Sequence, residues 1–321
     1  MGAFDRPQDF EDFIGQENVV DTLEVKIASA QKRGRPLDHL LLQGRPGLGK
    51  TTLAYIVTRQ MGVQIKVTSG PALTKAGDLA AILTSLEEGD VLFIDEIHRL
   101  PKAVEEALYP AIEDLAFDVI VGKGPGARLL RLSLNPFTLM GATTRISLIS
   151  KPLRSRFTSI LRLSAYDLDE VAEILDLYAG RLSLELDSNA KKELATACRG
   201  VPRNALQLLR HLRDLSVVSQ RKGAIDGALV KRALEGLGID SYGLDPVDRL
   251  VLTALAKKGR ALGLRTLSLL VGEEESALAE VNEPYLVQMG FLELTPKGRV
   301  VTSEGCAAVG LPPPDSPPSL L

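Results

Sequence analysis

A glycine-rich stretch between an apolar run and a helix-forming run carries the strongest chemical signal in the chain. Residues 44–52 read Gly-Arg-Pro-Gly-Leu-Gly-Lys-Thr-Thr, after the apolar run at 39–43 and before the helix-forming run at 53–57. Its glycines, which allow backbone N–H groups to turn inward around a phosphate, are Gly44, Gly47 and Gly49. Lys50 would place an ammonium on the β- and γ-phosphates of a nucleotide, and Thr51 would offer a hydroxyl to Mg²⁺. The stretch therefore predicts a phosphate-binding loop at the start of a helix.

Two acidic residues follow each other at the end of the apolar run at 91–95. Asp95 can hold the water shell of Mg²⁺, and Glu96 can polarise an attacking water as a general base. An acidic pair after a strand can also merely cap the next helix. Its position about 45 residues after a phosphate loop favours the catalytic interpretation.

Three further positions have side chains that could sense or stabilise phosphate charge. Thr144 follows the β-rich run at 138–142, where a hydroxyl would face the γ-phosphate. Arg156, beside Arg154, could be a finger that reaches the nucleotide of a neighbouring subunit. Arg203 starts a predicted helix and could touch the γ-phosphate of its own subunit. Each also has a plainer interpretation, as a strand-end threonine or a solvated surface arginine.

Composition and charge exclude several classes of protein. The chain has 321 residues, 45% of them hydrophobic and 25% charged, which is ordinary for a soluble globular protein of two or three domains. It has no apolar run near ~18 residues and no apolar secretion core, so we expect a cytoplasmic protein. Cys198 and Cys306 lie far apart and the three histidines are scattered, which argues against a disulfide framework or a metal cage. With a net charge of −3, any DNA contact must come from local basic patches.

Hydrophobic periodicity divides the chain into predicted domains at 1–165, 166–240 and 241–321. In the first, a predicted helix at 17–33 precedes short β-rich runs that alternate with helical stretches, which favours a parallel sheet with helices on both faces. These runs are 39–43, 63–67, 91–95, 138–142 and 159–163. A β-hairpin is predicted over 117–136, and its apolar residues suit either packing on its own domain or a docking surface.

The second and third parts have different patterns. Amphipathic repeats predict four helices in the second part, at 169–180, 189–199, 205–220 and 226–237. The third part predicts helices at about 245–257, 263–270 and 273–289, then two strands with a tight turn within 291–301. Three short helices followed by a β-wing predict a winged helix, and the proline-rich tail at 312–318 should be unstructured.

The order of these features along the chain resembles that of the AAA+ ATPases. Within them, it resembles the family of the bacterial Holliday junction branch migration motor RuvB. The resemblance extends over nearly the whole chain. Its most specific stretches are 13–17, 37–41, 47–52, 68–71, 77–84, 95–100, 141–145 and 283–286. It implies an α/β fold in which an AAA+ P-loop core of parallel sheet carries a β-hairpin insertion, followed by an all-α lid domain and a C-terminal winged-helix domain.

The resemblance also implies roles for individual residues. ATP or ADP would be bound by Asp5, Arg6, Gly47, Leu48, Gly49, Lys50, Thr51, Thr52, Glu113, Asp114, Leu115, Arg156, Tyr166 and Arg203. Mg²⁺ would be held by Thr51 and Asp95. The catalytic set would be Lys50, Asp95, Glu96, the first sensor Thr144, the second sensor Arg203 and the trans-acting finger Arg156.

The function that the resemblance implies is an ATP-dependent DNA translocase of the helicase type. A homohexameric ring would encircle duplex DNA and drive branch migration of Holliday junctions in homologous recombination and DNA repair. It would work with RuvC and with RuvA, which would contact the hairpin at 117–136. The winged helix would face DNA through Lys297 and Arg299. The alternatives are a non-motor AAA+ switch or loader and a winged-helix regulator with a decayed ATPase core.

Four positions depart from the pattern of this family. Arg45 stands where the family usually has proline, and we expect its side chain to point outward and touch nothing. Thr158 replaces a glycine after the finger. Glu275 and Leu294 occupy positions where the family has arginines. The loss of two phosphate contacts predicts weak DNA binding by an isolated subunit, with a salt dependence flattened by roughly two charges.

Overall fold

The computed structural model describes residues 6–121, 128–219 and 223–313. The chain separates into two compact units, one formed by residues 1–44 and 48–164 and the other by residues 45–47 and 165–321. Asp5, which the sequence predicts to bind nucleotide, lies outside the described residues, as do the turn of the hairpin at 122–127 and most of the proline-rich tail. Among the described helices, none combines the length and apolar character that crossing a membrane requires.

The first unit is built on a five-stranded parallel sheet, as the sequence predicts, and the structure places the strands in the order β2-β3-β6-β1-β7. Its strands are β1 (Leu40–Gln43), β2 (Ile65–Ser69), β3 (Val91–Asp95), β6 (Thr138–Thr143) and β7 (Ser159–Arg162). The inner strands β1, β3 and β6 are buried almost throughout, because both faces of a parallel sheet are covered. The edge strand β2 is half exposed and begins at Ile65, later than the run predicted at 63–67.

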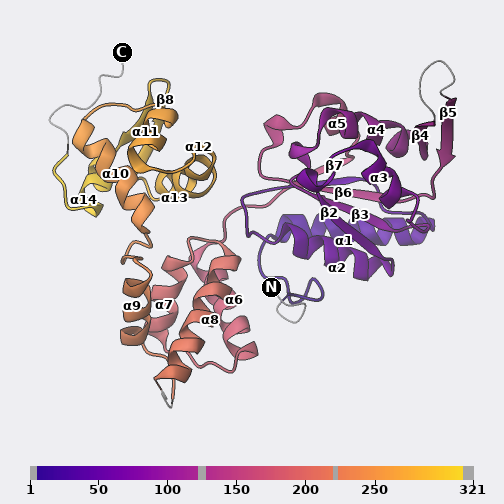
Figure 1. Ribbon diagram of the computed structural model, residues 1–321. Helices are drawn as coiled ribbons and strands as arrows, with labels where there is room; N and C mark the ends of the chain where they lie inside the picture. Colours follow the sequence, from indigo (N-terminus) through magenta and orange to yellow (C-terminus); the bar gives the residue numbers. More distant parts are fainter. Residues whose placement is uncertain (1–5, 122–127, 220–222, 314–321) are drawn as a thin grey trace. The chain divides into compact units, whose positions relative to one another are not determined.

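Helices cover both faces of this sheet (Figure 1). On one face lie α1 (Glu17–Arg33) and α2 (Lys50–Met61), and on the other lie α3 (Ala76–Leu83), α4 (Lys102–Glu113) and α5 (Lys151–Ser155). Helix α1 buries four apolar side chains at helical spacing: Val19, Leu23, Ile27 and Ala30. Short 3₁₀ turns, η2 (Gly70–Ala72), η3 (Ile97–Arg99) and η5 (Ile146–Leu148), follow strand ends.

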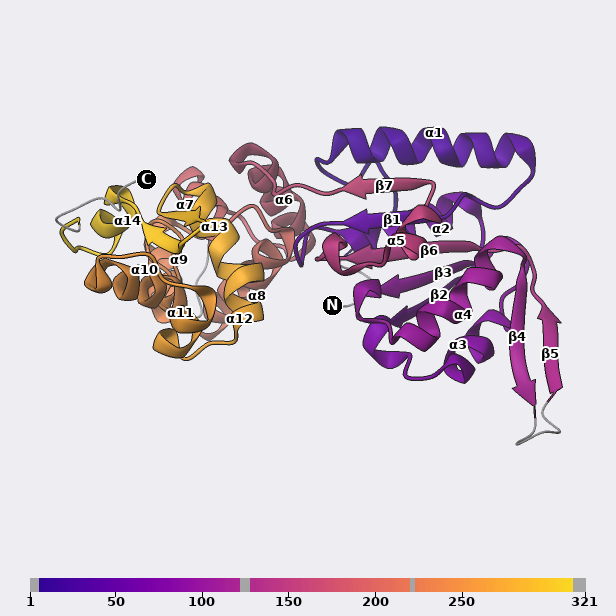
Figure 2. The same ribbon diagram turned by 90° about the horizontal axis from the view of Figure 1, so that it is seen from above.

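The predicted hairpin insertion is present as β4 (Ala116–Val121) paired with antiparallel β5 (Arg128–Ser133). Figures 1 and 2 both show it extending away from the parallel sheet. Phe117 at its base is buried in the core of α3 and α4. Further along β5, Leu129 and Leu130 are 68% and 50% exposed. The hairpin is thus anchored on its own domain at one end and exposes apolar side chains beyond that anchor.

The second unit begins with the four predicted lid helices. They are α6 (Leu168–Arg181), α7 (Ser188–Ala197), α8 (Pro202–Val218) and α9 (Gly227–Gly236). An aspartate before each of three helices accepts a hydrogen bond from a first-turn N–H group: Asp167, Asp187 and Asp226. Helix α8 begins with Pro202, directly before Arg203 and before the amphipathic repeat predicted at 205–220, because proline is well suited to the first position of a helix.

The winged helix follows in the same unit. It contains α10 (Pro246–Lys258), α11 (Leu264–Val271), α12 (Glu275–Ala277), the π-helical segment η6 (Leu278–Asn282), α13 (Glu283–Gln288), β8 (Leu292–Thr295), β9 (Gly298–Val301) and α14 (Ser303–Ala308). The helix predicted at 273–289 is therefore interrupted by a π segment, and α14 was not predicted. Leucines of α10, α11 and β8 pack with Tyr285 and Phe291 into its core.

Arg199, just after α7, joins the lid to the winged helix through polar contacts. Its Nε donates to the carbonyl of Gly243 at 2.7 Å, and its Nη2 lies 2.7 Å from Asp248 Oδ2 and 3.2 Å from Asp245 Oδ2. The guanidinium also lies over the ring of Tyr285, 4.9 Å from its centroid. Since the Asp248 side chain is fully buried, this ion pair is a specific joint between the two domains.

Candidate nucleotide site

The phosphate loop has the backbone geometry that anion binding requires. Gly47 and Gly49 adopt φ values of 83° and 105°, a left-handed region that favours glycine. Gly49 is the N-cap of α2, and among the described residues no side chain caps that helix start. A helix start without a side-chain cap suits phosphate oxygens as acceptors for its N–H groups, and the helix dipole adds partial positive charge there.

Lys50 lies inside this loop rather than on the surface. Its side chain is 6% exposed, and its Nζ donates to the carbonyl of Gly44 at 2.7 Å, across the loop. Thr52 is also buried, and Thr51 is half-buried in the same first turn of α2. The ammonium therefore lies within the loop, next to the place where the loop N–H groups would bind phosphate oxygens.

The sheet order brings the other predicted residues to the same edge as the loop. Strand β6 lies between β1 and β3, and the register pairs Gln43 with Thr143 and Gly141 with Ile94. The amide of Gly44 donates to the carbonyl of Thr143 at 3.1 Å. The carboxyl ends of parallel strands form the usual binding edge of such sheets. The loop after β1, the sensor after β6 and the acidic pair after β3 therefore meet there.

The predicted general base and the predicted first sensor are in direct contact. Glu96 Oε2 accepts hydrogen bonds from Thr144 Oγ1 at 3.1 Å and from its backbone amide at 3.3 Å. Glu96 has a left-handed backbone with φ 47°. A Cβ at Gly70 would lie 2.4 Å from the Glu96 carbonyl oxygen, so only glycine allows this close approach. The turn after Asp95 is thus held in an uncommon conformation that aims the carboxylate at β6.

His98 and Thr143 belong to this cluster, and the sequence reasoning missed both. His98 Nδ1 lies 3.1 Å from Glu96 Oε2 and 2.9 Å from Thr143 Oγ1, and the His98 side chain is 7% exposed. The imidazole therefore helps to fix the orientation of the carboxylate. The available signal was the position of His98, two residues after the base in a turn that follows a buried strand.

The predicted finger Arg156 lies along its own domain. Its Nη1 donates to the carbonyl of Pro152 at 2.6 Å, its Nη2 pairs with Glu113 Oε1 at 2.8 Å, and its guanidinium lies 4.2 Å from the ring centroid of Tyr109. Its Nε is buried without a hydrogen-bond partner among the described residues. A buried donor of this kind usually has a functional or structural reason.

The predicted nucleotide contacts at 113–115 join the end of α4 to its surroundings. Glu113 holds Arg156, and Asp114 Oδ2 pairs with Arg131 Nη2 of β5 at 2.6 Å. Leu115 has φ 50°, and its carbonyl accepts from the amide of Leu134 at 2.7 Å. The stretch therefore connects the finger to the hairpin.

Two predicted nucleotide residues of the second unit lie at one turn, beside the loop segment 45–47. The amide of the buried Tyr166 donates to the carbonyl of Gly200 at 3.0 Å. A Cβ at Gly47 would lie 2.7 Å from Val201 Cγ1 and 2.9 Å from Arg203 Cβ. The turn that starts α8 thus places the predicted second sensor next to a phosphate-loop glycine.

Arg6 and Arg45 each have a contact partner. The guanidinium of Arg6 lies 5.0 Å from the ring centroid of Tyr55, on α2. Arg45 Nη2 donates to Gln288 Oε1 at 3.3 Å, and burial lowers the pKa of the Arg45 guanidinium. The expectation that Arg45 touches nothing is therefore wrong, because its long side chain finds an amide acceptor within its own unit.

The predicted DNA contacts on the wing differ in their surroundings. Lys297 is exposed in the turn between β8 and β9. Arg299 instead forms a two-pronged ion pair with Glu283, at 2.6 Å and 3.0 Å, and the Glu283 side chain is 6% exposed. The positive charge of Arg299 is therefore largely neutralised by Glu283 inside the winged helix.

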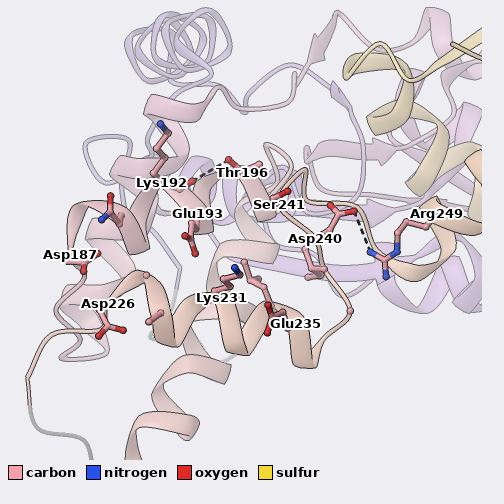
Figure 3. Close-up of a pocket in the computed structure, with 16 residues that line it drawn as sticks. Asp187, Lys192, Glu193, Thr196, Asp226, Lys231, Glu235, Asp240, Ser241 and Arg249 are labelled. Carbon is pink, nitrogen blue, oxygen red and sulfur yellow. Dashed lines mark hydrogen bonds and ion pairs between the residues drawn. The ribbon is translucent and has the colours of Figure 1, made fainter. Parts of the chain in front are cut away.

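A cavity of about 1110 Å³ lies in the second unit, between α7, α9 and the segment that leads into the winged helix (Figure 3). None of the residues that the sequence predicts for nucleotide or DNA lines it. Asp187 and Asp226 at its rim cap helices, and Asp240 pairs with Arg249 at 3.5 Å. These four charged residues thus have structural roles, and the cavity lacks a glycine-rich loop that would bind phosphates.

Comparison with known proteins matches three consecutive domains. The Holliday junction DNA helicase RuvB P-loop domain matches residues 5–163, the RuvB AAA lid domain 166–240 and the RuvB C-terminal winged helix domain 241–310. The solved RuvB Holliday junction branch migration motor of Thermotoga maritima is 46% identical with a TM-score of 0.87, covering 96% of this chain and 99% of that chain. A lysine-to-arginine mutant of the same protein is 46% identical with a TM-score of 0.88, covering 98% and 100%. The chain therefore belongs to the RuvB family of AAA+ ATPases.

Proposed function

We propose that this chain is an ATP-driven motor that moves duplex DNA and so drives branch migration of Holliday junctions in recombination and repair. The observation that carries the proposal is the cluster at the sheet edge. There Glu96 is hydrogen-bonded to Thr144 beside a phosphate loop that encloses Lys50. Together with membership of the family, this arrangement supports repeated hydrolysis rather than nucleotide binding alone.

The phosphate loop binds the nucleotide, and residues at the strand ends act on the attacking water. Backbone N–H groups and Lys50 bind and orient the phosphates. Thr51 and Asp95 supply hard oxygen donors that suit Mg²⁺, which would neutralise charge on the phosphate oxygens. Glu96 orients the attacking water and draws its proton, and His98 fixes the carboxylate. Because Thr144 donates to the same carboxylate oxygen, a change at the γ-phosphate alters the position of the base.

We infer a homohexamer in which Arg156 acts on the nucleotide of the neighbouring protomer. Its unpartnered Nε offers a further donor, and the contacts with Glu113 and Tyr109 would hold the finger until a neighbour is present. Arg203 and Tyr166, at the turn next to Gly47, would report the nucleotide state to the lid.

We place the remaining partners by the surfaces that suit them. The hairpin, with Leu129 and Leu130 exposed, would contact RuvA, and the motor would act with RuvC in the cytoplasm. The domains would be 1–165 for the ATPase, 166–240 for the lid and 241–321 for the DNA-facing winged helix.

A branch migration assay on a synthetic four-way junction tests this proposal. The full chain with ATP should separate the junction into duplex products faster when RuvA is present, and Lys50→Ala should be inactive. A switch or loader, which the family does not favour, would bind ATP yet leave the junction intact. A winged-helix regulator with a decayed core would release no phosphate from ATP. Either result would refute the motor.

A further inference from the structure

The helical stretch at 275–288 has the wrong charge for a DNA-reading helix. In helix-turn-helix relatives, the recognition helix lies in the major groove between two rows of phosphates. This stretch contains no lysine or arginine but three glutamates, and Glu273 and Glu274 precede it. Glu275 lies in its first turn and is exposed. A helix of this composition is repelled by the phosphates of a groove.

Two polar side chains of the same stretch face the protein interior instead. Asn282, at the end of the π-helical segment, donates to Asp248 Oδ1 at 2.7 Å. Glu283 holds Arg299 in the two-pronged ion pair. Both Asn282 and Glu283 are buried, with 5% and 4% exposure. The side chains of Asn282 and Glu283 therefore stabilise the interior of the domain and are not exposed to a ligand.

The unpaired positive charge of the winged helix lies elsewhere. Seven lysines and arginines occur in residues 241–313, and two of them, Arg249 and Arg299, form ion pairs. The other five are exposed and have no ion pair among the described residues: Lys257, Lys258, Arg260, Arg265 and Lys297. We call these five the turn patch, because four of them lie in the segment 257–265 that connects α10 to α11.

The backbone brings the fifth member of the turn patch next to the other four. Leu262 and Arg299 exchange backbone hydrogen bonds of 3.0 Å and 2.8 Å, so the segment 257–265 pairs with the wing. A Cβ at Gly298 would lie only 2.4 Å from the carbonyl oxygen of Leu262. Lys297, the neighbour of Gly298 in the wing turn, thus lies beside the segment that carries the other cations.

Favourable interaction with helix dipoles explains the presence of only some of the cations in the turn patch. Lys257 and Lys258 lie in the last turn of α10, where cations interact favourably with the helix dipole. Arg265 lies in the first turn of α11, where a cation is unfavourable and where no acidic residue balances it within that turn. Arg260 belongs to neither helix. A role outside the domain accounts for the cations that local stability does not.

We infer that the winged helix binds the phosphate backbone of duplex DNA through the turn patch, with the helix at 275–288 turned away from the duplex. This inference rests on the proposed motor function and specifies its DNA surface. Contacts to phosphates carry no sequence information, as a motor that moves along any sequence requires. One protomer has few such contacts, so useful affinity comes from several protomers acting together in a ring.

The test is a salt titration of duplex binding by the full chain with a slowly hydrolysed ATP analogue and Mg²⁺. The observable is the slope of log Kobs against log salt over roughly 50 to 200 mM, which changes by about 0.9 for each phosphate contact. The combined variant Lys258→Ala, Arg260→Ala and Arg265→Ala should lower the slope by about 0.9 for each substituted residue in contact with DNA. The matched control is Lys231→Ala with Arg232→Ala, two exposed cations on lid helix α9, and should keep the slope of the unmodified chain.

A second variant probes the opposite face of the domain. Glu275→Gln removes a carboxylate from the helix that we infer to face away, so affinity should change less than about twofold, the scale of a screened distant charge. Should the combined variant unfold, judged by circular dichroism, single Lys258→Ala and Arg260→Ala carry the same test.

The outcomes separate this inference from the proposed function. An unchanged slope in the turn-patch variants, or a gain of tenfold or more in Glu275→Gln, overturns the inference while the motor stands. Absence of any duplex binding by the unmodified chain at about 50 mM salt, where phosphate contacts are strong, overturns both.

Discussion

Substitution of Arg199 should destabilise the second unit far more than substitution of an exposed arginine. Arg199→Ala removes the cation that faces Asp248, which is fully buried, and also removes the donor to the Gly243 carbonyl. Loss of one partner of a buried ion pair costs about 3–5 kcal/mol, because the other charge remains buried and uncompensated. The control is Arg213→Ala, whose pair with Asp214 is exposed on both sides, and it should cost about 0–1 kcal/mol.

The pH dependence of this loss follows from the titration of Asp248. Burial raises the pKa of the Asp248 carboxyl above its ordinary value, and the Arg199 charge opposes that shift. In Arg199→Ala the opposition is gone, so the pKa of the folded state rises further. A carboxyl with a raised folded pKa favours folding below its unfolded pKa, and this contribution is lost as pH rises through the folded value. The deficit of Arg199→Ala should therefore be smallest near pH ~4 and grow toward neutral pH.

Urea unfolding followed by far-UV circular dichroism measures these free energies. The set comprises the unmodified chain, Arg199→Ala, Asp248→Asn, the double variant and Arg213→Ala, each at acidic and neutral pH. The double variant should lose less than the sum of the single losses, by about 0.5–3 kcal/mol, because neither partner is left alone. A cost for Arg199→Ala no larger than that for Arg213→Ala would refute the buried-pair argument.

Four further predictions follow from the site and the winged helix. Glu96→Gln should bind ATP normally but hydrolyse it about 10²–10⁴-fold more slowly, as measured by nucleotide binding and phosphate release; normal turnover would exclude a general base. Arg156→Ala should lower turnover of the assembled ring by about 10³-fold or more, and unmodified chain mixed in small amounts should restore part of it; normal hydrolysis would rule out a finger acting in trans. Gly298→Ala should lower the melting temperature more than Gly272→Ala. Both glycines have left-handed φ, but only at Gly298 would a Cβ meet a backbone atom, at 2.4 Å; equal losses would contradict this. The isolated subunit should bind duplex DNA poorly, and a nanomolar affinity at moderate salt would contradict that expectation.

The sequence predicts the fold well where local chemistry decides it. The phosphate loop, the buried inner strands and the lid helices follow from glycines, continuous apolar runs and amphipathic repeats, all of which are local patterns. The predicted run at 63–67 starts before the edge strand β2, because apolar and polar residues alternate along it and the pattern does not mark where the strand begins. The π-helical segment η6 could not be predicted, because it depends on tertiary partners of Asn282 at its end and of Glu283 directly after it.

Side-chain partnerships in the site were the least predictable part. The contact of His98 with Glu96 and Thr143 depends on the sheet placing β3 next to β6, which no local pattern reveals. The ion pair of Arg299 with Glu283 likewise joins a strand to a helix. Residue types therefore indicate which groups can act, and the tertiary structure decides which of them already have partners.

The end of helix α4 contacts both Arg156 and strand β5 of the hairpin. Consecutive carboxylates there hold the finger through Glu113 and strand β5 through the pair of Asp114 with Arg131. A displacement of strand β5 changes the exposed pair of Arg131 with Asp114, one residue away from the Glu113 carboxylate that pairs with Arg156. In the proposed ring, a protein bound to the hairpin would therefore act on the residues that hold Arg156, and would set the timing of ATP turnover from outside the ring.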